Sequence, residues 1–467
     1  MTTTLMTPAQ WAESEFASAE LGDRRRTQRL VKVAANLAQS PAGTLPQAFP
    51  EWSDLKAAYR FFNQPKNTFE QIQKPHWEHT RAICQEPGQY LLIEDTSELD
   101  YTDHPMTEEL GIIGDGRGRG LLLHSTLAMR IEGWDSEERP QVVAVGLLRQ
   151  HCWSRWGQPK RKGKESRRQL MSRSRESQRW AAALEEGGPR TGSTWIYVGD
   201  RESDFYEPIE RCQRQGADFV LRGFHDRVLS EGDGHLKAAI AAAPVRGRYK
   251  LEMRARAGRA ARTAQVEVRT LAVSLKGPRR LDGKRPDFQA NAVEVREVDA
   301  PQGIEPLHWL LLTSLPSDTW AQVRRVIGIY SLRWCIEEYH KALKTGAGAE
   351  DSQMERAYRI ESLVAVLGVV AIRLFNTKWL ARTRPGEPVD PKIFGPELLV
   401  LLAAKFGKPK GGWTHQTALV AIARVGGFLA RRSDGMPGWQ TIWRGWNRLM
   451  WMCHGLETLK DEQEKCG

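Results

Sequence analysis

The residues between positions 330 and 344 combine acids, bases and a hydroxyl at spacings that suit phosphate chemistry. Successive residues of an α-helix are about 100° apart, so Tyr330, Arg333, Glu337 and Lys344 fall within roughly 60° of one another. Pairing of Arg333 with Glu337, four residues later, explains part of this stripe. It does not explain a tyrosine and a lysine on the same stripe. A glutamate that holds a divalent metal, flanked by cations and a hydroxyl that hold phosphates, explains all four residues.

Two aspartates stand at the ends of apolar runs that are predicted to be strands. Asp95 ends the run LLIE, and Asp200 ends WIYVG. Ligands gather at strand ends in α/β folds, so the two carboxylates can share a site. Mg²⁺ prefers hard oxygen ligands, and two such ions about 4 Å apart can activate an attacking oxygen and stabilise a leaving one. The alternative for each aspartate alone is a turn former or a helix N-cap.

Short apolar runs between residues 90 and 221 predict the strands of a catalytic core. A polar stretch at 165–185 and the segment before residue 219 are predicted to be helical. The order strand, strand, strand, helix, strand, helix, strand is typical of a ribonuclease-H-like α/β core, in which helices cover both faces of a mixed sheet. The predicted strands cover residues 90–95, 126–131, 142–148, 195–200 and 219–221.

Other patterns flank and interrupt this core. Residues 11–19, 23–37 and 53–64 are predicted to be helices, the second and third capped by Asp23 and Ser53. Apolar and polar residues alternate between about 223 and 315, which predicts an all-β insertion. A long helix is predicted over 319–344. We expect a helical domain at 1–70, a catalytic domain at 71–380 that contains the insertion, and a helical domain at 381–467.

The charge of the chain favours a polyanionic partner. Lys and Arg total 68 against 57 Asp and Glu, a net charge of +11 that does not by itself distinguish DNA, RNA and a membrane surface. The segment 155–179 is strongly basic, and either a DNA-facing loop or a solvated face explains it.

The longest apolar run, residues 363–372, is too short to span a bilayer. Six cysteines without CxxC spacing, and no signal peptide at the start, predict reduced thiols in a cytoplasmic protein.

Three motifs together resemble a known family. They are EDT at 94–96, GDRESD at 199–204, and the series Y-x2-R-x3-E-x6-K from Tyr330 to Lys344, which TGAGAE follows. The chain resembles the DDE transposases of bacterial insertion sequences. It is most similar to the group typified by the transposase of the kanamycin-resistance transposon Tn-five (IS-four family, IS-fifty group), from LGDRRRTQRLV near residue 21 to VAIARVGGFL near residue 420.

The resemblance implies roles for individual residues. Asp95, Asp200 and Glu337 match the metal-binding triad, which implies two Mg²⁺ ions, with Mn²⁺ as a substitute. Other residues match positions that contact DNA, and Trp309 among them matches an aromatic that stacks on a flipped base. The alternative for Trp309 is a core tryptophan that opens a strand. The DNA-contacting set comprises Arg25, Arg26, Arg29, Arg222, Trp309, Tyr330, Arg333, Lys341 and Lys344.

The resemblance further implies cut-and-paste transposition. Its partners would be double-stranded transposon-end repeats, target DNA and a second copy of the chain, joined through the C-terminal domain as a homodimer, with no membrane involved. Water would nick one strand, the freed 3′-hydroxyl would form a hairpin on the opposite strand, and the reopened 3′ ends would attack target DNA. Departures from the family's pattern are the basic segment 155–179 and the residues after Gly427, which match only loosely.

Three other functions remain open. A nuclease on the same fold would hydrolyse DNA without joining strands. A glycosidase would use paired carboxylates, although the basic charge and the lack of an aromatic-rich sugar cleft disfavour it. A non-catalytic DNA-binding relic would keep the fold and lose the chemistry.

Overall fold

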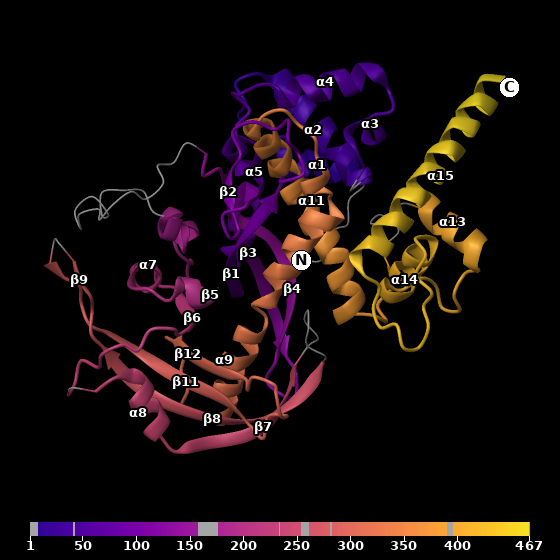
Figure 1. Ribbon diagram of the computed structural model, residues 1–467. Helices are drawn as coiled ribbons and strands as arrows, with labels where there is room; N and C mark the ends of the chain where they lie inside the picture. The colour runs from indigo at the N-terminus through magenta and orange to yellow at the C-terminus, as the bar shows by residue number, and fades with distance from the viewer. Residues whose placement is uncertain are drawn as a thin grey trace.

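The computed structural model describes residues 8–40, 43–156, 176–232, 234–253, 261–280, 283–389 and 396–466. Most of the basic segment predicted at 155–179, from 157 to 175, lies outside the described residues. A mixed α/β architecture runs through the rest, with helical groups beside a large twisted sheet (Figure 1). This agrees with the expected α/β class and with a ribonuclease-H-like catalytic core.

Ten strands form one continuous sheet, and helices lie against it (Figure 1). The strand order is β2-β3-β1-β5-β6-β12-β11-β8-β7, and β4 pairs with β3. Among the strands of the described residues, the pairs β1–β5 and β5–β6 are parallel and the other pairs are antiparallel. The strands are β1 (Gly88–Asp100), β2 (Gly111–Ile113), β3 (Gly118–Trp134), β4 (Pro140–Trp153), β5 (Ser193–Gly199), β6 (Asp218–Arg222), β7 (Val245–Met253), β8 (Arg262–Leu275), β11 (Phe288–Val298) and β12 (His308–Thr313).

Both faces of the central strands are buried, because alternate residues of β1 enter two different cores. Leu91 and Ile93 belong to a core that also contains the apolar face of α11 (Ala357–Thr383). Tyr90 and Leu92 belong to a second core with α7 (Tyr206–Gln215) and α8 (Leu236–Ala242). The central strands therefore read as nearly continuous apolar runs, as expected for strands that are covered on both sides.

The region predicted as an all-β insertion differs from the prediction in two ways. It contains the helix α8 between β6 and β7, and its strands do not form a sheet of their own. Instead β12 pairs with β6, which places β11, β8 and β7 in the same sheet as the core. A separate small hairpin joins β9 (Arg279–Arg280) to β10 (Gly283–Lys284). The insertion is thus an extension of the central sheet with a helix against it.

The helix predicted over 319–344 is interrupted, so the expectation of one straight helix is wrong. A helix α9 (Trp320–Ser331) ends before α10 (Trp334–Lys341), and the chain continues as a wide π-helical turn, η4 (Ala342–Gly346). The helix predicted at 165–185 is also absent from its described part, where two short 3₁₀ helices occur, η1 (Glu176–Arg179) and η2 (Ala182–Glu186). Two further 3₁₀ turns are η3 (Arg201–Ser203) and η5 (Ala349–Asp351).

Helices at the N-terminal side begin close to their predicted positions. Asp23 caps α2, its carboxylate accepting a hydrogen bond from the Arg25 amide at 2.8 Å. The third predicted helix begins two residues earlier than predicted, with Glu51 rather than Ser53 at its N-cap. The helices of this part are α1 (Pro8–Phe16), α2 (Arg24–Gln39), α3 (Leu45–Ala48), α4 (Trp52–Phe62) and α5 (Phe69–Cys84).

In the described part of the chain, three helices form the C-terminal group, in which α14 packs on α11, α15 packs on the turn η4, and α13 packs on the other two. They are α13 (Pro396–Phe406), α14 (His415–Val425) and α15 (Trp439–Cys466). The indole of Trp446 donates to the Gln39 carbonyl at 3.2 Å, so this group also contacts the N-terminal helices.

By length and composition α11 could cross a membrane, but 78% of its apolar window is buried in the protein, as in the core helix of a globular fold. Five cysteines are buried thiols: Cys84, Cys152, Cys212, Cys335 and Cys453.

Candidate active site

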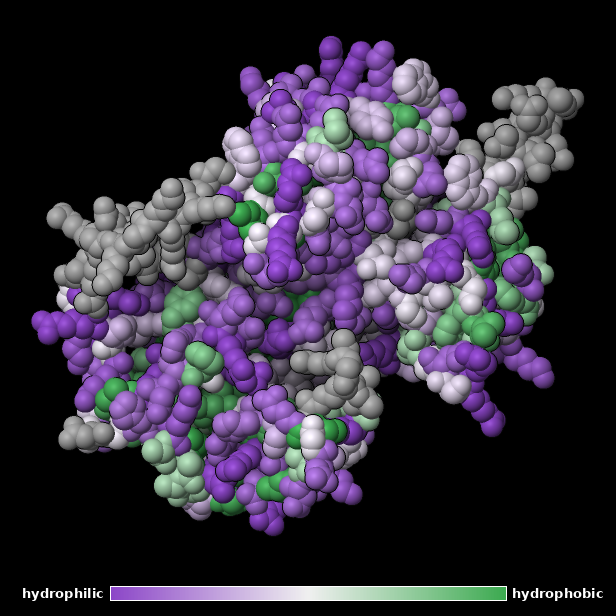
Figure 2. Space-filling view, viewed as in Figure 1, coloured by the Kyte–Doolittle hydropathy of each residue, from purple (hydrophilic) through white to green (hydrophobic). Residues whose placement is uncertain are grey.

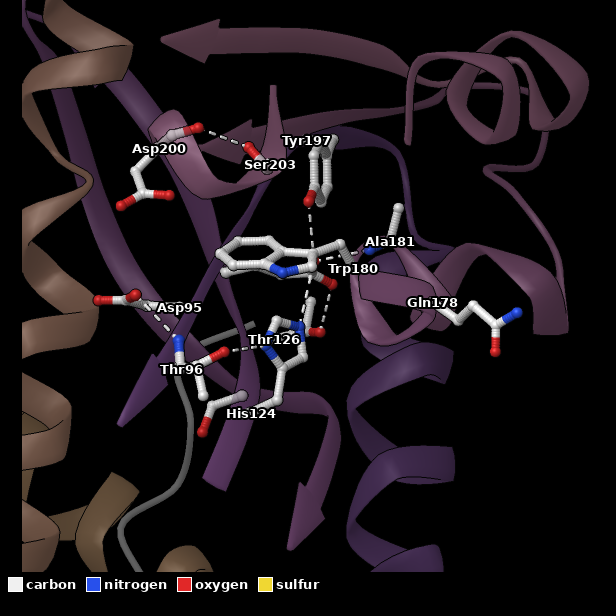
Figure 3. A network of polar contacts seen from close by, with 12 residues as sticks. Asp95, Thr96, His124, Thr126, Gln178, Trp180, Ala181, Tyr197, Asp200 and Ser203 are labelled. Carbon is white, nitrogen blue, oxygen red and sulfur yellow. Dashed lines mark hydrogen bonds and ion pairs between the residues drawn. The ribbon is translucent and has the colours of Figure 1, made fainter. Parts of the chain in front are cut away.

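The two predicted aspartates lie on neighbouring parallel strands at the same end of the sheet. Pairing of β1 with β5 stops at Ile93 and Val198, and both aspartates lie two residues beyond this last pair (Figure 3). Asp95 is followed by further residues of β1, which pair only with β3 from this point. Asp200 directly follows β5 and also caps η3, accepting from the Glu202 amide at 2.8 Å. The capping role that was the alternative for Asp200 is therefore present as well.

Asp95 carries a strongly perturbed carboxyl group. Burial, together with the charges of Asp200 and Glu337, outweighs the attraction of Arg333 and raises the pKa of Asp95 to about 6. Its side chain is 19% exposed. Like charges oppose ionisation, so Asp200 and Glu337 both act to raise this pKa, and the three acids form one candidate group. They come from three separate elements, β1, the end of β5 and α10.

Arg333 links two of the three acids. Its guanidinium Nη1 lies 3.5 Å from Asp95 Oδ2, and its Nη2 donates to Glu337 Oε1. The break after α9 positions this side chain, because the Arg333 amide bonds to the Tyr330 carbonyl at 3.0 Å and α10 starts at the next residue. Tyr330, Arg333 and Glu337 thus gather at one place even though the helix is not continuous.

Lys344 does not join this group through any contact in the structure. It lies in the π-helical turn η4, and its ammonium is 3.2 Å from the Glu350 carboxylate. Glu350 in turn accepts from the Asp100 amide at 2.9 Å, at the far end of β1. The four-residue stripe calculated for a straight helix is therefore wrong at Lys344. Lys341 is exposed and lies 3.2 Å from Glu338.

An aromatic and basic cluster borders the acids. The Trp309 and Tyr330 rings meet edge to face with centroids 5.1 Å apart. Arg222 lies beside the Tyr330 hydroxyl and donates to the His308 carbonyl at 3.1 Å. Burial raises the pKa of Tyr330, so its hydroxyl keeps its proton and is able to donate a hydrogen bond. Trp309 is only partly buried at the start of β12, which leaves part of its ring accessible.

Two family models match this chain. A transposase DNA-binding model matches residues 8–67, and a transposase DDE domain model matches residues 172–371. Together the two matches span more than half of the chain. The chain is a DDE transposase. The first match covers α1 to α4, and the second contains both Asp200 and Glu337, whereas Asp95 lies between the two matched regions.

DDE transposase domains use divalent metal ions, and the donor chemistry of this transposase fits one. Asp95, Asp200 and Glu337 offer hard carboxylate oxygens, and their mutual repulsion is the condition that a divalent cation relieves. Among the described residues no three His, Cys, Asp or Glu side chains stand at metal-holding distances from one another. Arg333 supplies positive charge between Asp95 and Glu337 instead, so metal binding requires a small movement of these side chains.

The N-terminal arginines of the transposase differ in their surroundings. Arg25 is exposed on the first turn of α2. Arg26 donates to the Leu21 carbonyl at 3.0 Å, and Arg29 lies 3.2 Å from the Asp54 carboxylate on α4. Arg26 and Arg29 therefore help to hold the helices of the DNA-binding domain together, while Arg25 is exposed to solvent.

A buried polar network beside the site was not predicted from the sequence. It contains Glu94, His124, Thr126 and Tyr197, all of them nearly or fully buried. Glu94 ends the apolar run of β1 at a buried position opposite Thr126 on β3. A charged residue at the end of an apolar run is more often a surface residue, so no local pattern indicates that Glu94 is buried.

Proposed function

We propose that this transposase performs cut-and-paste transposition of a bacterial insertion sequence, as a member of the group that the sequence resembles. Asp95, Asp200 and Glu337 would hold two Mg²⁺ ions, for which Mn²⁺ substitutes. The observation that supports this is geometric: Asp95 and Asp200 lie just beyond the paired part of two neighbouring parallel strands, and Arg333 contacts both Asp95 and Glu337. Ions held there would lower the pKa of the attacking water or hydroxyl and stabilise the leaving oxygen.

The neighbouring side chains would position the DNA end. The Tyr330 hydroxyl, which keeps its proton, would donate to a phosphate oxygen, and Arg222 beside it would contribute positive charge. Arg333 is close enough to the acids to reach a phosphate bound next to them. The accessible part of the Trp309 ring would stack on a base flipped out of the duplex.

The proposed reaction has four phosphoryl-transfer steps at each end. Water attacks a phosphodiester at the transposon end and leaves a 3′-hydroxyl. That hydroxyl attacks the opposite strand, which produces a hairpin and releases the flanking DNA. A second water reopens the hairpin, and the restored 3′-hydroxyl attacks target DNA in the bacterial cytoplasm. A homodimer joined through α13 to α15 would hold two ends together, with Lys341, Lys344 and the N-terminal arginines on DNA.

Cleavage of linear DNA that carries the terminal inverted repeats of the encoding element tests this proposal. We expect nicks, hairpins and joined products that require Mg²⁺, resolved on a denaturing gel. Glu337→Ala is expected to reduce cleavage to background and to leave end binding largely intact. Glu338→Ala is the matched control, because Glu338 lies one residue away on α10 and pairs with Lys378 at 3.3 Å and with Lys341.

Each other outcome contradicts a stated part of the proposal. Metal-dependent nicks without joined products would indicate a nuclease on the same fold. Binding without any cleavage would indicate a non-catalytic relic. Normal cleavage by the Glu337→Ala protein with Mg²⁺ would remove Glu337 from the metal site.

A further inference from the structure

Glu94 is a fully buried carboxylate beside the catalytic Asp95. Its Oε1 accepts from the Thr126 hydroxyl at 2.7 Å, and its Oε2 accepts from the Ala181 amide at 2.7 Å and the Tyr197 hydroxyl at 2.9 Å. A buried carboxylate is costly unless donors satisfy it, and three donors converge on this one. The donors come from β3, from the turn before η2 and from β5.

This arrangement joins the strands that carry the two catalytic aspartates. Glu94 precedes Asp95 on β1, and Tyr197 lies three residues before Asp200 on β5. The backbone pairing of β1 with β5 ends at Ile93 and Val198, just before both aspartates. The hydrogen bond from Tyr197 to Glu94 is therefore a side-chain link between the two strands, close to where their backbone pairing stops.

His124 extends the network to the backbone of Asp95. Its Nδ1 lies 2.9 Å from the Thr96 hydroxyl, its Nε2 lies 3.4 Å from Glu94, and the Trp180 ring covers it at 4.8 Å. The Thr96 amide donates to Asp95 Oδ1 at 2.9 Å. Figure 3 shows this sequence of contacts from Asp95 through Thr96 to His124. Fixing the Thr96 side chain thus fixes the amide that orients the Asp95 carboxylate.

The segment that contains Trp180 and Ala181 is also bound to this network, through contacts with Glu94 and His124. Ala181 has a left-handed backbone with φ of 56°, a conformation that a non-glycine residue keeps only when its surroundings enforce it. The hydrogen bond from its amide to Glu94 and the contact of Trp180 with His124 are such constraints. Through these hydrogen bonds the Glu94 carboxylate on β1 connects β3, β5 and the segment around Ala181.

We propose that Glu94, with Tyr197, His124 and Thr96, forms a positioning network that sets the separation and orientation of Asp95 and Asp200 for metal binding. None of the four side chains touches the DNA or the metal in this role. The inference rests on the proposed metal site, since it assigns the network a function at that site. The competing explanation is a polar core cluster that stabilises the sheet and has no influence on the metal.

Conservative substitutions distinguish the two explanations. Tyr197→Phe removes only the hydroxyl that links β5 to Glu94, and Thr96→Val removes only the hydroxyl that bonds His124. Tyr90→Phe is the matched control: Tyr90 is also fully buried, and its hydroxyl donates to the Ile83 carbonyl at 2.8 Å, away from Glu94. All three variants lose one hydrogen-bonding hydroxyl and nearly preserve the shape of the side chain.

The full-length protein is titrated with Mn²⁺ in complex with a pre-cut end duplex, and free Mn²⁺ is measured by electron paramagnetic resonance. Partners that orient metal ligands typically change metal affinity by about 10- to 100-fold. We expect Tyr197→Phe and Thr96→Val to weaken Mn²⁺ binding by about 10-fold, at the lower end of that range, because each acts on a ligand through one intermediary. Tyr90→Phe is expected to bind Mn²⁺ like the wild type. Thermal melting without metal is recorded for all four proteins.

Two results would overturn the inference. In the first, Mn²⁺ affinity is unchanged in Tyr197→Phe and Thr96→Val while their melting temperatures fall, as for a purely structural cluster. In the second, Tyr90→Phe weakens Mn²⁺ binding as much as the other two, as for a general loosening of β1. A failure of the proposed function can be told apart from a failure of this inference. In that case the wild-type protein itself would show no cleavage or no Mn²⁺ binding.

Discussion

Asp95 holds its charge where burial and two other carboxylates oppose ionisation. A carboxyl whose pKa is higher in the folded protein than in the unfolded chain destabilises the fold once pH exceeds both values. For a rise from 3.8 to about 6, the cost at neutral pH is about 2 to 3 kcal/mol. The site therefore carries a stability cost that a bound divalent cation would offset.

Asp95→Asn is expected to stabilise the metal-free protein while it abolishes cleavage. The amide removes the unfavourable charge, so the melting temperature should exceed that of the wild type at pH 8. As pH falls through about 6 the wild-type carboxyl takes up a proton, and the difference should shrink and disappear near pH 4. Thermal denaturation in the presence of a chelator at pH 4, 6 and 8 measures this.

Asp54→Asn provides a control of opposite sign. Hydrogen bonding and ion pairing to Lys32 and Arg29 lower the pKa of Asp54, so its charge stabilises the fold at high pH and this contribution is lost as pH falls. Its asparagine variant should melt lower than the wild type at pH 8. A lower melting temperature for Asp95→Asn at pH 8, or a gain that does not depend on pH, would contradict the explanation.

Asp95, Asp200 and Glu337 could be predicted from the sequence as candidate site residues. Strand ends and helical periodicity depend on neighbouring residues, so they are recognisable without the fold. Their role as metal ligands stays a prediction. Lys344 was misplaced because nothing in the sequence signals a π-helical turn. Glu94 was missed because its donors are distant in sequence, and only the folded sheet brings them together.

Helices and strands were predicted correctly where neighbouring residues determine them. They were predicted wrongly where tertiary contacts determine their bounds or their pairing. The N-cap of α2 follows from its residue type, and the core strands follow from short apolar runs. The break between α9 and α10 falls in a segment without glycine or proline, and Arg333 inside it is held by contacts to Asp95 and Glu337. The joining of β12 to β6 likewise depends on pairing between strands far apart in sequence.

The helices α14 and α15 cross at two glycines. A Cβ on Gly445 would overlap the Ile422 carbonyl, and one on Gly426 would overlap the Thr441 carbonyl. Gly445→Ala is therefore expected to force the helices apart and to destabilise the C-terminal helical group by about 1 to 3 kcal/mol, as other overpacked sites do. Urea denaturation and limited proteolysis within residues 396–466 measure the effect.

Gly455→Ala serves as the control on the same helix. Space is open around Gly455, so alanine should be neutral or stabilising by up to about 1 kcal/mol through its higher helix propensity. Equal effects at the two positions would mean that helix propensity, rather than the crossing of α14 and α15, decides the outcome.

Across the whole molecule, α11 connects the parts that the sequence suggested as separate domains. It packs against α2, α4 and α5 on the N-terminal side, against β4 of the sheet, and against α14 of the C-terminal group. The predicted boundaries at 70 and 380 therefore separate groups that share one core.

Polar side chains dominate the visible surface, and apolar patches occur over the C-terminal helices (Figure 2). Val400, Leu429 and Trp451 are exposed there, which is compatible with the proposed dimer contact.

The net charge of +11 leads to a prediction about how this transposase binds DNA ends. Each phosphate that a lysine or arginine neutralises releases a counterion, so the logarithm of the association constant should fall linearly with the logarithm of salt concentration, by about 0.9 per contact. Arg25 is exposed on the DNA-binding domain, and Arg25→Ala should reduce that slope by about 1. Arg431 is held by Asp434 on the C-terminal side at 3.0 Å, and Arg431→Ala should leave the slope unchanged.

Fluorescence anisotropy of a labelled end duplex at several salt concentrations measures both slopes. The comparison matters because a basic protein binds any polyanion to some extent, whereas a slope that changes with Arg25 and not with Arg431 assigns the phosphate contacts to α2. A binding constant that does not change with salt would mean that the basic residues do not touch phosphates. Equal changes for Arg25→Ala and Arg431→Ala would mean that the charge acts as a diffuse field over the whole surface rather than through the N-terminal helices.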